Sequence, residues 1–506
     1  MALSYSKLFA SSTAMALIMS NAAYADVTAE DVWAQLQEIS GLYGRTLVVG
    51  SKSYTGGKMT LSDVAVSAKV EGAEREGSIE MIELQERGDG SVAITVSPEI
   101  KINTSSEAEH GGDFSAAVFV RHTGLSLVAS GDPDKITYDF DANELAVAVE
   151  DLSVEDEDIP ADINFVASGV KGLYSFETGD MINSETQTTI DSADFDFGID
   201  QVEDGETFKM KMKGSVADMT STSVYEFPKD IDLSDSTAMF GADVSVVSKA
   251  TFGPANYTMD FDADGDTVAV KGSTAKSTLD VAINDGTVQY GGTGSGTKFE
   301  IEGSQIPLPD MTFSMADSAF NLMFPMAQSE EPKDFKFLTK MIDLEISDSL
   351  WSMIDASGAL PHDPATLIVD LAGKANWLVD IMNPDFATEM TSEMPVELHS
   401  LTVNEIKLDL AGAEVNGTGD FTFDNTDLVS YDGMPAPTGK LNLNLFGING
   451  LLDNLASAGL LPQDQSMGAR MMLGLFTRPG EGEDTLTSEI EFKDKGSIFA
   501  NGQQLK

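Results

Sequence analysis

Cysteine is absent from the 506 residues of this chain. Without it the chain has no disulfide bond, no thiolate metal site, no catalytic cysteine and no lipid-modified N-terminal cysteine. Basic residues are scarce, with 30 Lys and Arg against 83 Asp and Glu, so the formal net charge is −53. A surface this acidic repels nucleic acid and anionic membranes, because both bind basic patches. We therefore expect no nucleic-acid partner, and either a cationic partner or simply a solvated acidic surface.

Long apolar runs are also missing. No run of 18 or more apolar residues follows Ala25, so the sequence predicts no transmembrane helix. Before that point, Lys7 is the only charged residue, and a weakly apolar run leads to Ala23-Tyr24-Ala25, an A-x-A cleavage pattern. Residues 1–25 are therefore predicted to be a signal peptide that is cleaved after Ala25 and exports the chain to the periplasm.

Recognisable catalytic motifs are lacking as well. The four histidines show no H-x-x-x-H spacing, and no G-x-S-x-G nucleophile motif occurs. The glycine-rich stretch Gly291–Gly296 is followed by Thr297, where a phosphate-binding loop needs lysine. We therefore predict a protein that is not an enzyme and needs no cofactor. A hydrolase with paired carboxylates stays open as an alternative, because so many acidic residues supply pairs by chance.

What the sequence does contain is a short helix followed by many strands. Thr28 can cap a helix with Asp31 at its third position, and the apolar stripe of that helix is Val32, Trp33, Leu36 and Ile39. From Thr46 onward, apolar residues recur with the period of two that is typical of strands with one buried face. Met59, Leu61, Val64 and Val66 follow this period with one slip.

Turn signals between these alternating segments predict antiparallel hairpins. They are Gly88-Asp89-Gly90, Glu203-Asp204-Gly205 and Asn284-Asp285-Gly286. The predicted fold is mainly β, with long curved antiparallel sheets of the meander or half-barrel type, a small helical insert and a C-terminal helical hairpin.

Three regions are predicted after the signal peptide. Residues 26–306 form an N-terminal antiparallel β region with the short leading helix. Residues 307–395 form a mixed insert, because apolar residues recur at helical spacing in 335–344 and 350–360. Residues 396–506 form a C-terminal β region that contains a helical hairpin over 447–476.

One internal similarity has two interpretations. Asp139-Phe140-Asp141-Ala142 recurs 121 residues later as Asp260-Phe261-Asp262-Ala263, and Val-Ala-Val at 147–149 recurs at 268–270 with the same offset. Either a strand-turn-strand unit is duplicated, or similar hairpins have converged on the same composition.

A possible calcium site lies in the second of these segments. Asp260, Asp262, Asp264 and Asp266 alternate around Gly265 like the start of an EF-hand loop. Lys271 stands at the twelfth position, where that loop needs glutamate, so an Asp-Gly hairpin tip is the competing interpretation. Weak Ca²⁺ binding by the four aspartates remains a prediction.

Methionine and phenylalanine gather between 311 and 326. Met adapts to irregular apolar shapes, so such a segment is either a buried core helix or the lining of a site for an acyl chain. The candidate ligand-binding residues are Met311, Phe313, Met315, Phe320, Met323, Phe324, Met341 and Trp351.

The segment Leu350–Leu367 resembles a family of uncharacterised secreted proteins from alphaproteobacteria, the domain of unknown function 2125 (DUF2125). The segments Gly459–Pro462, Met471–Leu475 and Asn501–Gln503 are similar to that family as well. The resemblance implies a bacterial source and an envelope location, and it supplies no catalytic residue. The C-terminal pattern is also loosely similar to β-rich envelope proteins that carry lipids in amphipathic grooves, a likeness of architecture alone.

Together these observations predict a non-enzymatic periplasmic or envelope protein that binds a hydrophobic or lipid-like ligand in an apolar groove between curved sheets. An outer-membrane β-barrel is the first alternative, although the ending Leu505-Lys506 lacks a terminal aromatic residue. A hydrolase acting on envelope polymers is the second.

Overall fold

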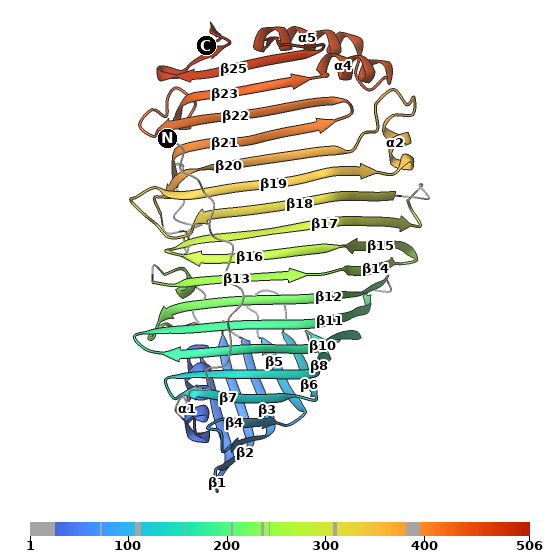
Figure 1. Ribbon diagram of the computed structural model, residues 1–506. Helices are drawn as coiled ribbons and strands as arrows, with labels where there is room; N and C mark the ends of the chain where they lie inside the picture. The colour runs from blue at the N-terminus through green and yellow to red at the C-terminus, as the bar shows by residue number, and fades with distance from the viewer. Residues whose placement is uncertain are drawn as a thin grey trace, which may run out of the picture.

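The computed structural model describes residues 26–506 except 71–72, 107–112, 156, 204–205, 234–236, 242, 307–310, 380 and 382–394. The predicted signal peptide, residues 1–25, lies outside the described residues, as does His110. The described part is one antiparallel sheet of 27 strands with the helices α1 (Ala29–Leu42), α2 (Asp348–Ile354), α4 (Ile448–Ser457) and α5 (Gln463–Phe476) (Figure 1). The prediction of a mainly β fold is confirmed.

The strands follow one another along the sheet in chain order (Figure 1). The first part contains β1 (Arg45–Thr55), β2 (Lys58–Val70), β3 (Ala73–Glu86), β4 (Val92–Val96), β5 (Glu99–Ser106), β6 (Phe114–Thr123), β7 (Ser126–Asp132), β8 (Lys135–Val154) and β9 (Glu157–Asp158). The middle part contains β10 (Ala161–Thr178), β11 (Met181–Glu203), β12 (Glu206–Pro228), β13 (Ser245–Phe252), β14 (Ala255–Ala263), β15 (Asp266–Thr274), β16 (Lys276–Asn284), β17 (Thr287–Gly303) and β18 (Met311–Pro325). The last part contains β19 (Lys333–Ile346), β20 (Ala365–Trp377), β21 (Val396–Leu410), β22 (Ala413–Asp424), β23 (Ala436–Phe446), β24 (Arg478–Pro479), β25 (Thr485–Lys493), β26 (Ser497–Ala500) and β27 (Gln503–Gln504).

The sheet is a single continuous meander. Several short strands lie end to end and act together as one long strand: β3 pairs with both β4 and β5, and β12 pairs with both β13 and β14. When these are counted as one strand each, every main strand pairs with its neighbours in the sequence. The predicted hairpins at 88–90 and 284–286 are confirmed. Glu203 pairs with Glu206, as the third predicted hairpin, at 203–205, requires.

The two faces of this sheet differ sharply in polarity. Directly opposed residues of an antiparallel pair share a face, so the pairing assigns each side chain. One face carries Met59, Leu61 and Leu84, which are all buried; we call it the apolar face. The other, the polar face, carries cross-strand ion pairs such as Lys213 with Asp196 at 2.6 Å.

A line of left-handed residues crosses the strands and bends the sheet. The residues have φ between 50° and 65°, and at each of them the pairing skips one or two positions. The register continues unchanged across these skips, except between β19 and β20, where it shifts between Met341 and Leu344. They are Asp63, Gly124, Gly169, Asp218, Gly296 and Asp343. We call this line the crease. At the crease two successive residues face the polar side, which accounts for the slip that the sequence shows between Leu61 and Val64.

The same feature explains a wrong prediction. The helix expected over 335–344 is a strand, β19, and the segment 311–326 belongs mainly to strand β18. Phe337, Thr339 and Met341 share the apolar face, and the crease at Asp343 moves the next position on this face to Leu344. A step of three residues inside a strand imitates helical spacing, and in the sequence alone the two cannot be distinguished.

The sheet is continuous across both boundaries of the predicted three-part division. Ile301 of β17 pairs with Met311 of β18 across the boundary at 306, and β20 pairs with β21 across the boundary at 395. Among the described residues of 307–395, α2 is the one helix. The C-terminal helical hairpin is confirmed as α4 and α5.

The internal similarity does not correspond to a repeated unit. Residues 139–142 and 147–149 lie within one strand, β8, whereas residues 260–263 and 268–270 lie in β14 and β15 on either side of a turn. The two segments therefore share their composition but not a strand-turn-strand structure.

Helix α1 closes the N-terminal end of the apolar face. The predicted cap is confirmed: the Asp31 N–H donates to Thr28 Oγ1 at 3.2 Å, and the Asp31 carboxylate accepts from the Thr28 N–H. Val32 and Trp33 are buried against strands β2, β3, β4, β7 and β8. Buried Gln35 donates to the Phe176 carbonyl and accepts from the Tyr138 hydroxyl at 2.8 Å, which ties the helix to β8 and β10.

None of the described helices is both long enough and apolar enough to cross a membrane.

We predict that the crease depends on left-handed backbone geometry. At Gly169, φ is +64° and an added Cβ would lie 2.1 Å from Asp191 Oδ2, so Gly169→Ala should lower the free energy of unfolding by about 1–2 kcal/mol. Asp63 has φ 52°, so Asp63→Gly relieves the same strain and should leave that free energy unchanged or raise it. Urea unfolding followed by circular dichroism checks both variants, and an equal loss in the two would contradict the prediction.

Candidate functional site

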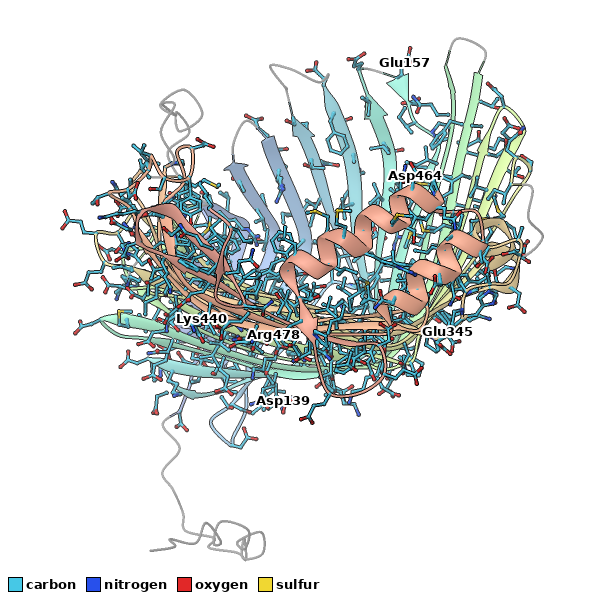
Figure 2. All side chains as sticks on the ribbon, turned by 90° about the horizontal axis from the view of Figure 1, so that it is seen from above. Asp139, Glu157, Glu345, Lys440, Asp464 and Arg478 are labelled. Atoms are coloured by element: carbon cyan, nitrogen blue, oxygen red, sulfur yellow. The ribbon has the colours of Figure 1, made fainter. Side chains whose placement is uncertain are left out.

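The apolar face forms the inside of a trough. Seen from above, the sheet curves around the side on which α4 and α5 lie, and Asp139 of the polar face projects from the outside (Figure 2). Leu451 and Leu455 of α4 share a cavity with Leu344 and Ile346, which belong to the apolar face. The concave side of the sheet is therefore its apolar side.

A single row of paired apolar residues runs along this trough. It crosses thirteen strands from β1 to β18 without a charged or polar side chain, and at about 4.8 Å per strand it is about 58 Å long. Its members are Leu47, Val66, Gly77, Ile102, Val118, Val149, Ile163, Phe197, Met212, Met259, Val270, Ile301 and Met311. We call these residues the apolar row.

The apolar row is open to solvent. All thirteen residues are half-buried, so each keeps part of its side chain accessible. Neighbouring side chains on the same face are more exposed still: Phe165 is 42% exposed, Phe208 43% and Phe337 41%. Contiguous exposed apolar surface on this scale marks a binding groove more often than an ordinary surface.

Glycines on the apolar face keep the trough shallow and smooth. An added Cβ on Gly272 would lie 2.2 Å from the Tyr257 ring, and one on Gly214 would lie 2.3 Å from the Phe195 ring. The rings therefore lie over the glycine backbones of neighbouring strands instead of standing up into the trough. Tyr290 and Phe320 pack in the same way across two strands, with ring centroids 5.1 Å apart.

Charge is distributed unequally between the two faces. Away from the first and last residues of the described strands, the pairing places no carboxylate on the apolar face. The strand carboxylates lie on the polar face, where lysines opposite them form ion pairs, for example Lys374 with Asp334 at 2.6 Å. The trough is thus a surface without carboxylates, away from the strand ends, in a highly acidic protein.

The structure brings together most of the residues predicted to line a ligand site. Met311, Phe313 and Met315 lie on one side of the crease in β18, and Phe320 and Phe324 lie on the other, all on the apolar face. Met341 of β19 lies opposite Ser318 on the same face.

Met323 lies elsewhere. It is paired with Gln289 and Lys336, which places it on the polar face. Strand geometry separates it from Phe324, because successive residues of a strand point to opposite faces.

Trp351 belongs to a second, more enclosed hollow. Its indole stacks on the His362 ring with centroids 4.4 Å apart and planes 8° from parallel. Both residues line a cavity of about 590 Å³ between α2, α4 and the ends of β19–β21, together with Ile354, Leu410 and Leu455. This cavity lies at the C-terminal end of the trough.

The loop that forms one wall of this cavity is held by Asp355. Its carboxylate accepts the Leu360 N–H at 2.6 Å and the Ser357 hydroxyl at 2.7 Å. The backbone hydrogen bond from Leu360 and the hydrogen bond from Ser357 hold the pKa of Asp355 below its ordinary value of 3.8. The ionised form therefore stabilises the loop.

Three of the four aspartates of the possible calcium site lie at a hairpin tip, and the fourth, Asp260, lies within β14 opposite Lys211 and Ala269. Asp264 has φ 52° and accepts the Thr207 N–H, Asp262 accepts the Gly265 N–H, and Asp266 accepts from Gln305. Within the described parts of the chain, no three metal-ligating groups gather in one place. Hydrogen bonding in the tip accounts for Asp262, Asp264 and Asp266, and weak Ca²⁺ binding by the four aspartates stays a prediction.

Sequence reasoning did not single out the N-terminal two thirds of the apolar row. Phe197, Met212 and Met259 look like ordinary members of alternating strands, and only the register shows that they are opposite one another. In the sequence, the one signal for these residues is that apolar and polar residues alternate with a period of two.

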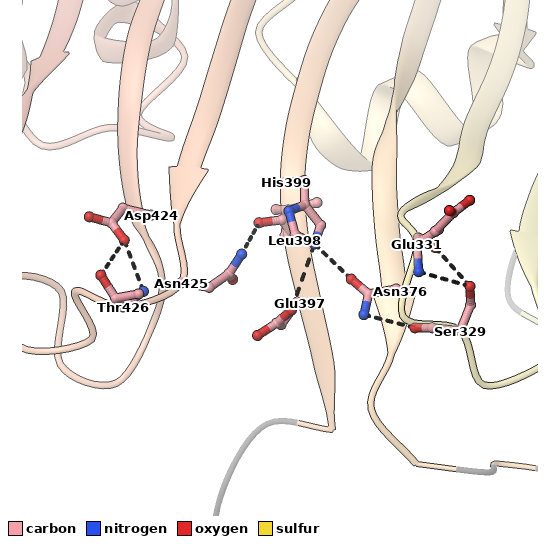
Figure 3. A network of polar contacts seen from close by, with 9 residues as sticks. All are labelled: Ser329, Glu331, Asn376, Glu397, Leu398, His399, Asp424, Asn425 and Thr426. Atoms are coloured by element: carbon pink, nitrogen blue, oxygen red, sulfur yellow. Dashed lines mark hydrogen bonds and ion pairs between the residues drawn. The ribbon is translucent and has the colours of Figure 1, made fainter.

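A polar network joins the ends of three strands at one edge of the trough (Figure 3). His399 Nε2 lies 2.7 Å from Asn376 Oδ1 and 3.7 Å from Glu397 Oε2, while Asn376 donates to the Ser329 carbonyl. Asn425 donates to the Leu398 carbonyl. These contacts connect β20, β21 and the loop after β22, and thus hold the strand ends in place.

Comparisons with known proteins give a family and a distant similarity to a solved structure. A family model described as "Uncharacterized protein conserved in bacteria (DUF2125)" matches residues 247–502. No curated protein matches the chain. Among solved structures, the alcaligin outer-membrane receptor FauA from Bordetella pertussis is similar at 10% identity over 79% of this chain and 70% of its own, with a TM-score of 0.18.

We predict that acid loosens the Asp355 loop. A depressed pKa means that the contribution of Asp355 to stability is complete above its ordinary value and is lost as the pH falls through the folded-state pKa. The protection of residues 355–360 against hydrogen exchange, measured relative to the intrinsic exchange rate at each pH, should therefore fall below about pH 4 in the wild type. In Asp355→Asn, protection should already be lower at neutral pH and should lack that further loss in acid. A wild-type loop with the same exchange rates as the variant at neutral pH would contradict this role.

Proposed function

Because the chain belongs to the DUF2125 family of bacterial proteins, whose description names no activity, we propose its function from the trough: it binds a lipid-like ligand by burying apolar chains against the apolar row. The observation that carries this proposal is the row itself. Twelve consecutive pairings join its thirteen members, which are twelve apolar residues and one glycine, and none of them is buried by the described part of the chain.

Hydrophobic burial supplies the binding energy in this proposal. Covering apolar surface contributes about 25 cal/mol per Å², so a chain that covers a few hundred Å² of the trough gains several kcal/mol. Met212, Met259 and Met311 suit variable chains, because the thioether side chain adapts its shape. No bond to the ligand is made or broken.

The cell envelope is the proposed place of action. The predicted signal peptide over residues 1–25 supports export, and a trough that is open along its length suits a ligand that must enter and leave from the side. In this view α1 closes one end of the trough, and α2 and α4 flank the other. Mass spectrometry of lipids extracted from natively purified protein would identify the ligand.

Substitutions in the apolar row should weaken binding of a neutral apolar probe. We expect Met212→Asn with Met259→Asn to reduce the affinity for N-phenyl-1-naphthylamine by about tenfold or more, because polar amides remove apolar contact area from the middle of the trough. Titration of probe fluorescence measures this affinity.

Matched controls come from the polar face of the same two strands. Lys211→Asn and Thr258→Asn stand next to Met212 and Met259 in the sequence but point outward, so they should leave the affinity unchanged. The proposal fails if the wild-type protein does not bind the probe, or if both pairs of variants lose affinity equally.

A further inference from the structure

A second cavity lies at the N-terminal end of the apolar face, beside the C-terminal end of α1. Its volume is about 730 Å³, and its walls include Val66, Gly77, Ile102 and Val118, which are four members of the apolar row. It is therefore continuous with the proposed trough. Two arginines, Arg45 and Arg75, also line it.

The register places these two arginines on either side of one small residue. Arg45 of β1 lies opposite Ala68 of β2, and Ala68 lies opposite Arg75 of β3. Two strand spacings separate the arginine Cα atoms by about 9.6 Å, and both side chains are on the apolar face. Ala68 between them leaves space above the sheet that two long side chains can share. Thr104, opposite Arg75 on the other side, also lines this cavity and adds a hydroxyl.

The electrostatic setting of this pair differs from that of other basic residues. On the polar face, lysines lie beside carboxylates, as Lys135 does with Glu177 at 2.7 Å. The described lining of the N-terminal cavity contains no carboxylate, and the Arg45 guanidinium lies over the Tyr43 ring at 5.4 Å. Two positive charges above apolar walls, in a chain with a net charge of −53, complement an anion attached to an apolar chain.

We infer that Arg45 and Arg75 bind the anionic head group of an amphiphile whose apolar chain lies along the apolar row. This inference rests on the proposed function and specifies its ligand class. Guanidinium groups pair with phosphate or carboxylate oxygens through two parallel hydrogen bonds, so a phosphate head group and a carboxylate head group both suit this site. The head group enters at β1–β3, and the chain extends past Ile102 and Val118 toward the middle of the trough.

Two probes with the same chain separate the head group from the trough. Isothermal titration calorimetry would measure binding of dodecyl phosphate, which is anionic, and of dodecanol, which is neutral, to the wild type and to Arg45→Gln with Arg75→Gln. We expect the double variant to lose affinity for dodecyl phosphate by about tenfold or more, because charge-assisted hydrogen bonds are lost. Its affinity for dodecanol should not change. Circular dichroism would check that the variant folds.

The control variant is Lys249→Gln. Lys249 lies opposite Thr222 and Asp280 on the polar face, so this change removes a positive charge outside the trough and should leave both affinities unchanged. Competition with inorganic phosphate tests the source of the anion, and it should displace dodecyl phosphate only weakly.

Each other outcome contradicts a different statement. If the double variant binds both probes as the wild type does, the head-group site is wrong and the trough stands. An equal loss for both probes means that the arginines support the cavity and not the anion, and full displacement by inorganic phosphate means that the site takes a free anion. If neither probe binds to the wild type, the proposed function fails together with this inference.

Discussion

In an antiparallel ladder, directly opposed residues share a face, and here this constraint acts across the whole chain. Because each main strand pairs with its sequence neighbours, the division into an apolar and a polar face continues through the sheet from β1 to β25. Backbone hydrogen bonds are satisfied by the neighbouring strands, so the sheet extends without a second layer along most of its length. Buried clusters are concentrated where α1 and the loop before β13 cover the apolar face.

The crease and the placement of charge turn this amphipathic sheet into a trough. Left-handed residues such as Gly169 and Asp218 shift the alternation at corresponding positions in the strands, so the bend forms a line rather than scattered kinks. The carboxylates spread over the polar side, where cross-strand lysines and solvent moderate their mutual repulsion. The apolar side is left free of the repulsion that an acidic surface would exert on an anionic ligand.

The family match covers only part of this arrangement. Residues 247–502 begin in β13 and end after β26, so they contain the C-terminal part of the trough and the cavity around Trp351. Helix α1 and the cavity of Arg45 and Arg75 lie outside the matched residues. In the proposed function, the shared region supplies apolar surface, and the N-terminal region of this chain supplies the closed end and the head-group site.

The sequence by itself determined the class of the fold, the capped helix at Thr28, the hairpins at 88–90 and 284–286, and the apolar cluster around Met311–Phe324. These are local features, set by capping, turn chemistry and period. Only the tertiary structure decided that 335–344 is a strand, that Met323 faces away from its neighbours in the cluster, and that Phe197, Met212 and Met259 form one row with it. Register is a relation between distant segments, and a crease that shifts the alternation by one residue cannot be distinguished from helical spacing until the strands are paired.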